Sequence, residues 1–90
     1  MAEIILTEPI EAHGVTIDKI KLRKPLGGDI RKHGLPYAAS GEGVMAINAS
    51  AVAKYIEVLG DIPSSSVDRL NPVDFQTCMA KVIDFFGGAQ

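Results

Sequence analysis

The sequence has no tryptophan, a single cysteine and no long apolar run. One cysteine, Cys78, excludes an intramolecular disulfide, and with His13 and His33 far apart along the chain it gives no metal-ligand spacing. No apolar run approaches the ~18 residues of a membrane span, and the N-terminal MAEIILTEP has an acid where a signal peptide carries bases. We therefore expect a protein of the reducing cytoplasm that is neither exported nor membrane-spanning.

The common motifs of enzymes are also missing. The sequence contains no G-x-G-x-x-G, no Walker loop and no nucleophile elbow. Gly27-Gly28 lacks the following Gly-Lys-Ser/Thr that would hold a phosphate, and Asp29 would repel one. The serines of residues 64–66 have no His or Lys base nearby in sequence, so we interpret them as helix caps. We predict no enzymatic activity and no catalytic, cofactor-binding or metal-binding residue.

The 90 residues predict one small domain that spans residues 1–90. A chain this short buries only roughly 60% of its unfolded surface on folding. Yet 47% of its residues are hydrophobic and its mean hydropathy is +0.17. We expect another subunit or a partner to cover part of this apolar surface. The net charge of −2 gives no basic excess for binding nucleic acid.

Residues 1–31 predict an antiparallel β-hairpin followed by a turn. The run EIILT, residues 3–7, is closed by Pro9, and alternation resumes after the turn signal His13-Gly14. The apolar positions of the second arm change parity near Asp18-Lys19, which predicts a β-bulge there. The opposite face gathers a basic row that we interpret as a solvated strand face or a site for an acidic partner: Lys19, Lys21 and Arg23.

The stretch LRKPLGGDIR, residues 22–31, connects the hairpin to the rest of the chain. We predict that Pro25 ends the strand and that Gly27-Gly28 permits a tight reversal. Asp29 then pins the turn through backbone N–H groups, while Arg31 pairs with a carboxylate. A direct contact with a client or a subunit is the alternative for this motif, whose residues are Arg23, Pro25, Gly28, Asp29 and Arg31.

Residues 32–43, KHGLPYAASGEG, predict a mobile loop, because glycines, a proline and small residues follow one another without a period. Leu35 and Tyr37 are the apolar anchors in this segment. They dock either on the core of the domain itself or on a neighbouring molecule.

Residues 44–88 predict the helical part of an α+β domain, with two main α-helices and a short helical turn between them. The first helix starts from Val44 and ends at Gly60. In the turn SSSVDRL, Ser65 and Asp68 have the spacing of a capping box. The apolar stripe of the first helix is Met45, Ala49, Val52, Ile56 and Leu59.

The last helix has the clearest start in the chain. Asn71 can cap it, Pro72 fits its first position, and Asp74 faces the positive end of its dipole. Gly87-Gly88 ends it. Its wide apolar face is either core or an oligomer seam and consists of Phe75, Cys78, Met79, Val82, Phe85 and Phe86.

Taken in order, these elements resemble the tail assembly chaperone family of contractile-tailed, Mu-like bacteriophages and their prophages. The most specific parts are a strand of the L-x-L-R-x-P type that runs into G-D-I-R, residues 21–31, and R-L-x-P-x-D-F, residues 69–75. The resemblance covers nearly the whole chain, and residues 32–43 match poorly. Neither motif is catalytic.

The resemblance implies an assembly factor in the bacterial host cytoplasm that requires no cofactor. Such a protein binds the tape-measure protein, keeps it soluble and promotes tail-tube assembly, and it leaves before the virion is finished. Family members self-associate, and many are made in two lengths by a programmed ribosomal slip. Phe85-Phe86-Gly87 permits such a slip, with a longer frameshifted product, if both Phe codons are TTT.

A chaperone of this kind needs apolar surface that binds weakly at many places, because avidity then supplies the strength. The candidate contacts with a client or a subunit are Leu35, Tyr37, Met45, Val52, Ile56, Phe75, Phe85 and Phe86. Two other functions are alternatives. One is a small structural or interaction subunit that stays in a phage tail or another particle. The other is a small nucleic-acid-binding regulator that uses the basic row, although no aromatic residue is interleaved with those bases.

Overall fold

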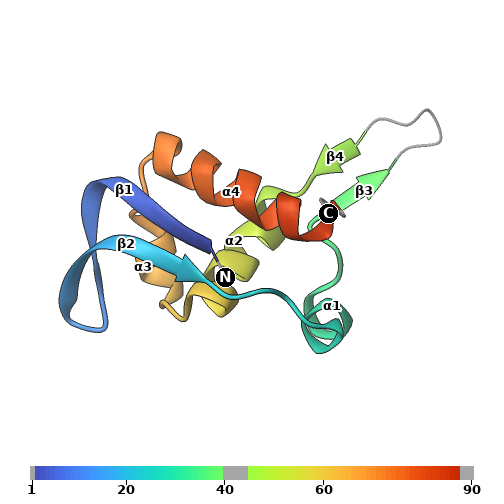
Figure 1. Ribbon diagram of the computed structural model, residues 1–90, viewed down its shortest axis with the longest axis horizontal. Coiled ribbons are helices and arrows are strands. Elements are labelled where there is room, and N and C mark those ends of the chain that lie inside the picture. The colour runs from blue at the N-terminus through green and yellow to red at the C-terminus, as the bar shows by residue number, and fades with distance from the viewer. Residues whose placement is uncertain (1, 40–44, 88–90) are drawn as a thin grey trace.

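The computed structural model describes residues 2–39 and 45–87. It confirms the α+β class, with an N-terminal antiparallel β-hairpin followed by helices (Figure 1). The described elements, in chain order, are β1 (Ala2–Ala12), β2 (Val15–Leu22), α1 (Gly27–His33), β3 (Tyr37–Ala39), β4 (Met45–Ile47), α2 (Ala49–Gly60), α3 (Ser64–Asp68) and α4 (Pro72–Phe86).

The hairpin of β1 and β2 turns at His13-Gly14, where both residues have positive φ. Its register shifts so that residues 6–9 of β1 stand opposite Asp18 of β2. The predicted bulge therefore lies at the expected level, but the extra residues are in β1. The prediction that Pro9 closes the first strand is wrong. Pro9 lies inside the register shift, where its missing N–H costs no hydrogen bond of the ladder.

The hydrophobic core lies between one face of this hairpin and the helices α2, α3 and α4 (Figure 1). The backbone of α2 comes close to β2 at Gly60, where an added Cβ would lie 2.9 Å from Cγ2 of Ile20. The buried apolar side chains are Ile4, Leu6, Ile10, Ala12, Ile20, Leu22, Val52, Tyr55, Ile56, Leu59, Ile62, Val67, Leu70, Cys78 and Val82.

The helix starts agree only in part with the sequence prediction. In α4, the side-chain oxygen of Asn71 accepts a hydrogen bond from Asp74 N (2.8 Å), and Pro72 occupies the first position. In α3, Pro63 stands at the N-cap and no side chain caps the helix, so the predicted capping box is wrong. The buried Ser66 of α3 instead donates its hydroxyl to the Glu11 carbonyl of β1.

Helix α2 begins at Ala49, later than the predicted start at Val44. Asn48 is extended and caps α2, because its side chain accepts a hydrogen bond from Ala51 N (3.1 Å). The residues before it are extended as well. Met45 therefore lies in β4, paired with Ala39, and does not extend the helical stripe.

Strands β3 and β4 form a second antiparallel hairpin that projects away from the core (Figure 1). The prediction of a loop without regular structure over residues 32–43 is wrong for residues 32–33, which end α1, and for residues 37–39, which form β3. Residues 40–43 lie outside the described residues. Among the described residues, β3 and β4 pair only with each other. Local sequence patterns do not reveal such pairing across a connection.

Candidate functional site

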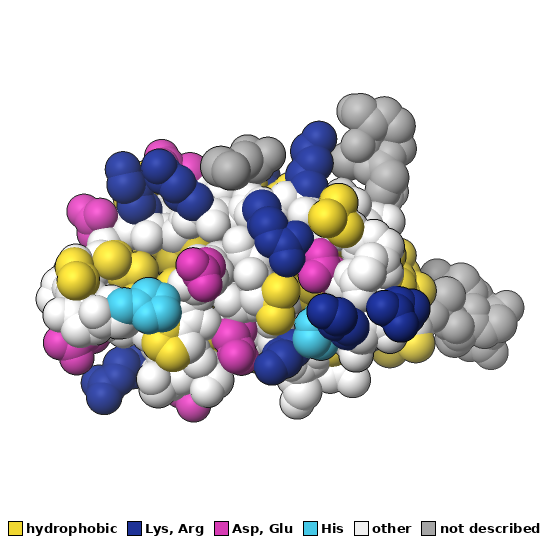
Figure 2. Space-filling model, turned by 90° about the horizontal axis from the view of Figure 1, so that it is seen from below, with side chains coloured by type: hydrophobic (Ala, Val, Ile, Leu, Met, Phe, Trp, Pro, Cys, Tyr) yellow, Lys and Arg dark blue, Asp and Glu magenta, His cyan; other side chains and the backbone are white. Residues whose placement is uncertain are grey.

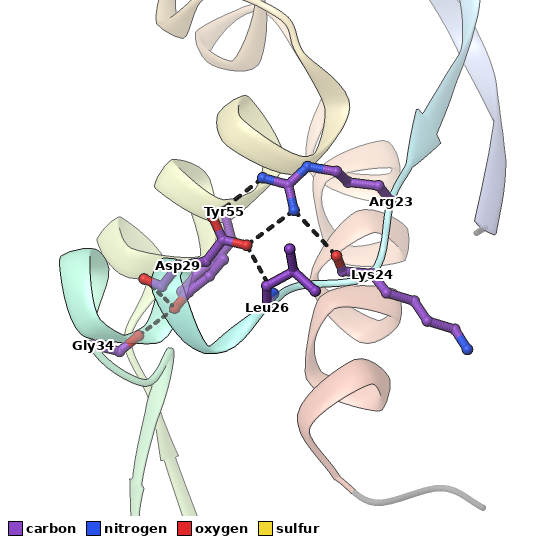
Figure 3. Close-up of polar contacts among 6 residues, drawn as sticks. All are labelled: Arg23, Lys24, Leu26, Asp29, Gly34 and Tyr55. Atoms are coloured by element: carbon purple, nitrogen blue, oxygen red, sulfur yellow. Dashed lines mark hydrogen bonds and ion pairs between the residues drawn. The ribbon is translucent and has the colours of Figure 1, made fainter.

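Asp29 holds the turn between β2 and α1 together (Figure 3). Its carboxylate accepts a hydrogen bond from Leu26 N (2.8 Å), and its own N–H donates to the Leu26 carbonyl (2.9 Å). This is the kind of backbone contact that the sequence predicts for Asp29. Strand β2 has already ended at Leu22, before Pro25, and Gly27-Gly28 open α1 instead of forming a tight reversal.

The base that faces Asp29 is Arg23 (Figure 3). Its two terminal nitrogens donate to the two carboxylate oxygens at 2.9 and 3.2 Å. These bonds, with the one from Leu26 N, hold the pKa of Asp29 at about 2, below its ordinary 3.8. The prediction that Arg31 pairs with a carboxylate is wrong within residues 2–39 and 45–87. The short connection between β2 and α1, residues 23–26, brings Arg23 to Asp29.

Tyr55 of α2 ties α1 to the core. Its side chain is fully buried, and its hydroxyl donates to the carbonyl oxygens of Gly34 (2.5 Å) and Asp29 (3.3 Å). Its ring makes edge-to-face contacts with His33 (5.8 Å between centroids) and Phe86 (5.1 Å). The sequence analysis did not single out Tyr55. The signal was its position three residues after Val52, on the buried side of the helix.

Asp74 connects the start of α4 to the irregular part of β1. Its carboxylate is buried and accepts hydrogen bonds from Thr7 N (2.9 and 3.0 Å), the Thr7 hydroxyl (3.1 Å) and Glu8 N (3.3 Å). The Asn71 side-chain amide donates to Thr7 Oγ1 (2.9 Å) and to Glu8 (3.1 Å). The backbone groups that the register shift frees therefore find partners on α4. The sequence predicts only the roles of Asn71 and Asp74 at the helix start.

The predicted contact residues fall into three groups. Val52 and Ile56 are fully buried on α2, so the prediction that they contact a partner is wrong for this fold. Phe75, Phe85 and Phe86 of α4 pack against the core and remain partly exposed. Leu35 is 49% exposed, while Tyr37 is half-buried against Phe86, 6.4 Å between ring centroids. Of Met45 the structure describes only the backbone.

The described surface has several hollows, of which the second and third below are mainly apolar. One, of about 380 Å³, lies at the base of the second hairpin and is lined by Leu35, Tyr37 and Ile47 among others. Another, of about 500 Å³, lies between α2, α3 and α4, where Ala53, Phe75 and Met79 line it. A third, of about 460 Å³, shares Met79 with the second and shares Ile47 with the first. Together they form a surface suited to binding other macromolecules through apolar contacts.

The Cys78 thiol and the acidic residues show no sign of a reactive or metal-binding site in the described part of the chain. Burial, with a smaller contribution from Asp74, raises the pKa of the Cys78 thiol to about 11, so the thiol stays protonated at neutral pH. Residues 2–39 and 45–87 contain no cluster of three or more His, Cys, Asp or Glu placed to hold a metal ion. In the same part of the chain, no helix has the length and apolarity needed to cross a membrane.

Comparison with known proteins identifies the family. A family model described as "Phage tail assembly chaperone proteins, E, or 41 or 14" matches residues 3–87. No curated protein and no solved structure matches the chain. The family match includes both hairpins, all the described helices and both motifs that the sequence analysis singled out. The chain belongs to the phage tail assembly chaperone family.

Proposed function

We propose that this protein binds the tape-measure protein of a contractile-tailed, Mu-like phage or prophage, keeps it soluble and promotes assembly of the tail tube around it. It does so as a homo-oligomer and without enzymatic activity. The single observation that carries the proposal is the uncovered apolar surface at the base of the second hairpin, where Leu35 and Ile47 are 49% and 47% exposed beside a hollow of about 380 Å³.

The position of this surface supports a role in binding a long client. Leu35 lies between α1 and β3, and Ile47 pairs with Tyr37 across the hairpin. Tyr37 is steadied by its ring contact with Phe86 and by its hydroxyl, which donates to the Phe86 carbonyl (3.5 Å). The apolar patch thus stands on a fixed base. Each such patch binds weakly, and several copies along one client supply the strength.

Co-expression with the tape-measure protein tests the proposal. We expect the client to be soluble and to co-purify only when this chain is present. Leu35→Asp should reduce the soluble client by more than half, because a charge on the patch opposes burial at every copy. Val15→Asp is the matched control, since Val15 is 60% exposed on β2 and lies in the other hairpin.

Thermal unfolding of both variants shows whether each keeps the fold. Equal client solubility with and without this chain would contradict the function. A Leu35→Asp chain that folds and solubilises the client as well as Val15→Asp would move the contact away from the hairpin base.

As an assembly factor of the bacterial cytoplasm, the protein is expected to leave before the virion is complete. Mass spectrometry of purified particles distinguishes this from the alternative of a structural tail subunit. A chaperone is absent from finished particles, whereas a subunit is present in fixed proportion to the other tail proteins.

A longer, frameshifted product is part of the same proposal. Helix α4 ends at Phe86, so a slip at or just after Phe86 leaves every core residue unchanged. The short and long products would then share one fold and differ only beyond it. Intact-mass measurement of the expressed gene detects the longer product, and a synonymous TTC codon at Phe85 should abolish it.

A further inference from the structure

Helix α1 presents an unusually exposed combination of apolar and basic side chains. None of its residues is buried, and Leu26 and Ile30, one helical turn apart, are 68% and 37% exposed. Arg31 and Lys32 in its last turn are exposed, as is Lys24 just before it. Basic side chains gather around apolar ones on this side of the molecule (Figure 2). We call these residues the basic arm: Lys24, Leu26, Ile30, Arg31 and Lys32.

A groove on another part of the chain has the complementary character. It consists of the hollows of about 500 and 460 Å³ that join along α4 at Gln76 and Met79. Its floor is apolar, and its charged lining is acidic, with Asp68 in one hollow and Asp84 in the other. No Lys or Arg of the described residues lines either hollow, although Arg69 and Lys81 are close in sequence. We call this surface the acidic groove.

Neither set of charges is neutralised within the described part of the chain. Its ion pairs join Lys19 to Glu3, Arg23 to Asp29, and Lys54 to Glu57. Across residues 2–39 and 45–87, Asp68 and Asp84 of the groove and Arg31 and Lys32 of the arm thus have no ion-pair partner. Both surfaces carry exposed charge beside apolar area.

The basic arm cannot enter the groove of its own chain. Tyr55 ties α1 to one side of α2 through the carbonyls of Gly34 and Asp29. Ala53, which lines the groove, is two positions away from Tyr55 in α2 and therefore points to nearly the opposite side of that helix. The groove can receive the arm only from another molecule.

We propose that the basic arm of one copy docks in the acidic groove of a second copy, head to tail. Leu26 and Ile30 would cover the apolar floor, and the bases would face Asp68 and Asp84. The arm is short enough for the groove. The seven residues of α1 span about 10 Å, whereas the groove follows α4 from Pro72 to Asp84 over about 18 Å. Because the two surfaces differ, the contact repeats from copy to copy and closes into a ring or grows as a filament.

The inference names the surfaces for the self-association that is part of the proposed function. Sedimentation velocity of the full chain over a wide range of concentration tests it. We expect association that increases with concentration and weakens as salt is added, because exposed ion pairs are screened. A wild-type chain that remains monomeric at every concentration would overturn the inference.

Charge-reversal variants of each surface make the test specific. The arm variant carries Arg31→Glu and Lys32→Glu, and the groove variant carries Asp68→Lys and Asp84→Lys. Each alone should associate at least about tenfold more weakly than the wild type, because like charges then meet in the contact. A control with Lys19→Glu and Lys21→Glu, on the far face of β2, should associate like the wild type once its melting curve shows a folded chain.

Mixing the variants tests whether the arm of one copy meets the groove of another. The arm variant keeps an intact groove and the groove variant keeps an intact arm, and the reversed arm and the reversed groove also carry complementary charges. The mixture should therefore associate like the wild type, with the two variants alternating. A chain that carries all four changes should associate again, because the reversed charges are complementary. A mixture that stays monomeric, or single variants that associate like the wild type, would overturn the proposed contact.

Client solubility separates this inference from the proposed function. A folded groove variant that no longer self-associates but still binds the client supports both the contact and the client role. A wild type that assembles head to tail but leaves the client insoluble would keep the inference and reject the function.

Discussion

The two hairpins have the same antiparallel pairing but very different surroundings. The hairpin of β1 and β2 lies with one face on the core, and Asp74 fastens its irregular segment to α4. The hairpin of β3 and β4 has strands of three residues, projects from the body and meets it through Tyr37 on Phe86 (Figure 1). The covered hairpin stabilises the fold. The projecting one leaves apolar surface for a partner, consistent with the family to which the chain belongs.

The largest effect is expected from breaking the attachment of the covered hairpin. Asp74→Ala would remove the buried carboxylate that accepts hydrogen bonds from Thr7 N and Glu8 N, and a hydrogen bond to a charged group contributes about 1.5–3 kcal/mol. We expect the free energy of unfolding to fall by about 3 kcal/mol, measured by urea denaturation. Asp74→Asn keeps one acceptor oxygen and should lie between Asp74→Ala and the wild type.

The same comparison predicts that Asp74→Ala opens the covered hairpin more than the projecting one. Amide hydrogen exchange should increase first across β1, because its attachment is lost, and less across α2. Wild-type stability in Asp74→Ala would show that the fold does not depend on this buried carboxylate.

A smaller effect is expected where α2 approaches the covered hairpin. Gly60→Ala puts a methyl group against the side chain of Ile20, which is itself buried and β-branched and cannot easily move. We expect a loss of about 1–2 kcal/mol, although alanine favours a helix, because overpacking a tight core outweighs propensity. The measurement is again urea denaturation.

Gly28→Ala is the matched control for that substitution. Gly28 lies in α1 with open space around its Cα, so alanine should be neutral or stabilising by about 0.5 kcal/mol. Equal behaviour of the two variants would show that the close approach at Gly60 has no energetic cost.

The difference between the hairpins also explains what the sequence could predict. The start of α4 depends on local chemistry at Asn71 and Pro72, and the structure places both as expected. Strands β3 and β4 depend on pairing across a connection, so the glycine-rich pattern of residues 32–43 conceals β3, and β4 was predicted as the start of a helix. The partner of Asp29 depends on the path of the chain between β2 and α1. Arg23 and Arg31 flank Asp29 in sequence, and only the fold selects Arg23.

The candidate contact surface also has a part that local sequence predicts and a part that only the fold creates. The sequence singled out Leu35, with Tyr37, as an apolar anchor in a segment without a period, and Leu35 is 49% exposed in the structure. Val52 and Ile56 were misassigned because an amphipathic stripe looks the same whether its own chain or a partner covers it. The acidic groove joins residues of α2, α3 and α4, so no single segment reveals it.

The smallest effect is expected at the turn before α1, and it should depend on pH. Asp29 has a folded-state pKa of about 2 against an ordinary 3.8, so its ionised form favours the folded chain. The stabilisation is complete above about pH 4 and is lost as the pH falls toward 2. The side chain of Asp29→Asn does not titrate in this range. At neutral pH this variant should melt at a lower temperature than the wild type, and the decrease should be smaller than the decrease in Asp74→Ala. Only the wild type loses the charge at residue 29 on acidification, so the difference between the two melting temperatures should shrink between pH 4 and pH 2. A difference that stays constant would show that the contact of Asp29 with Arg23 adds no stability.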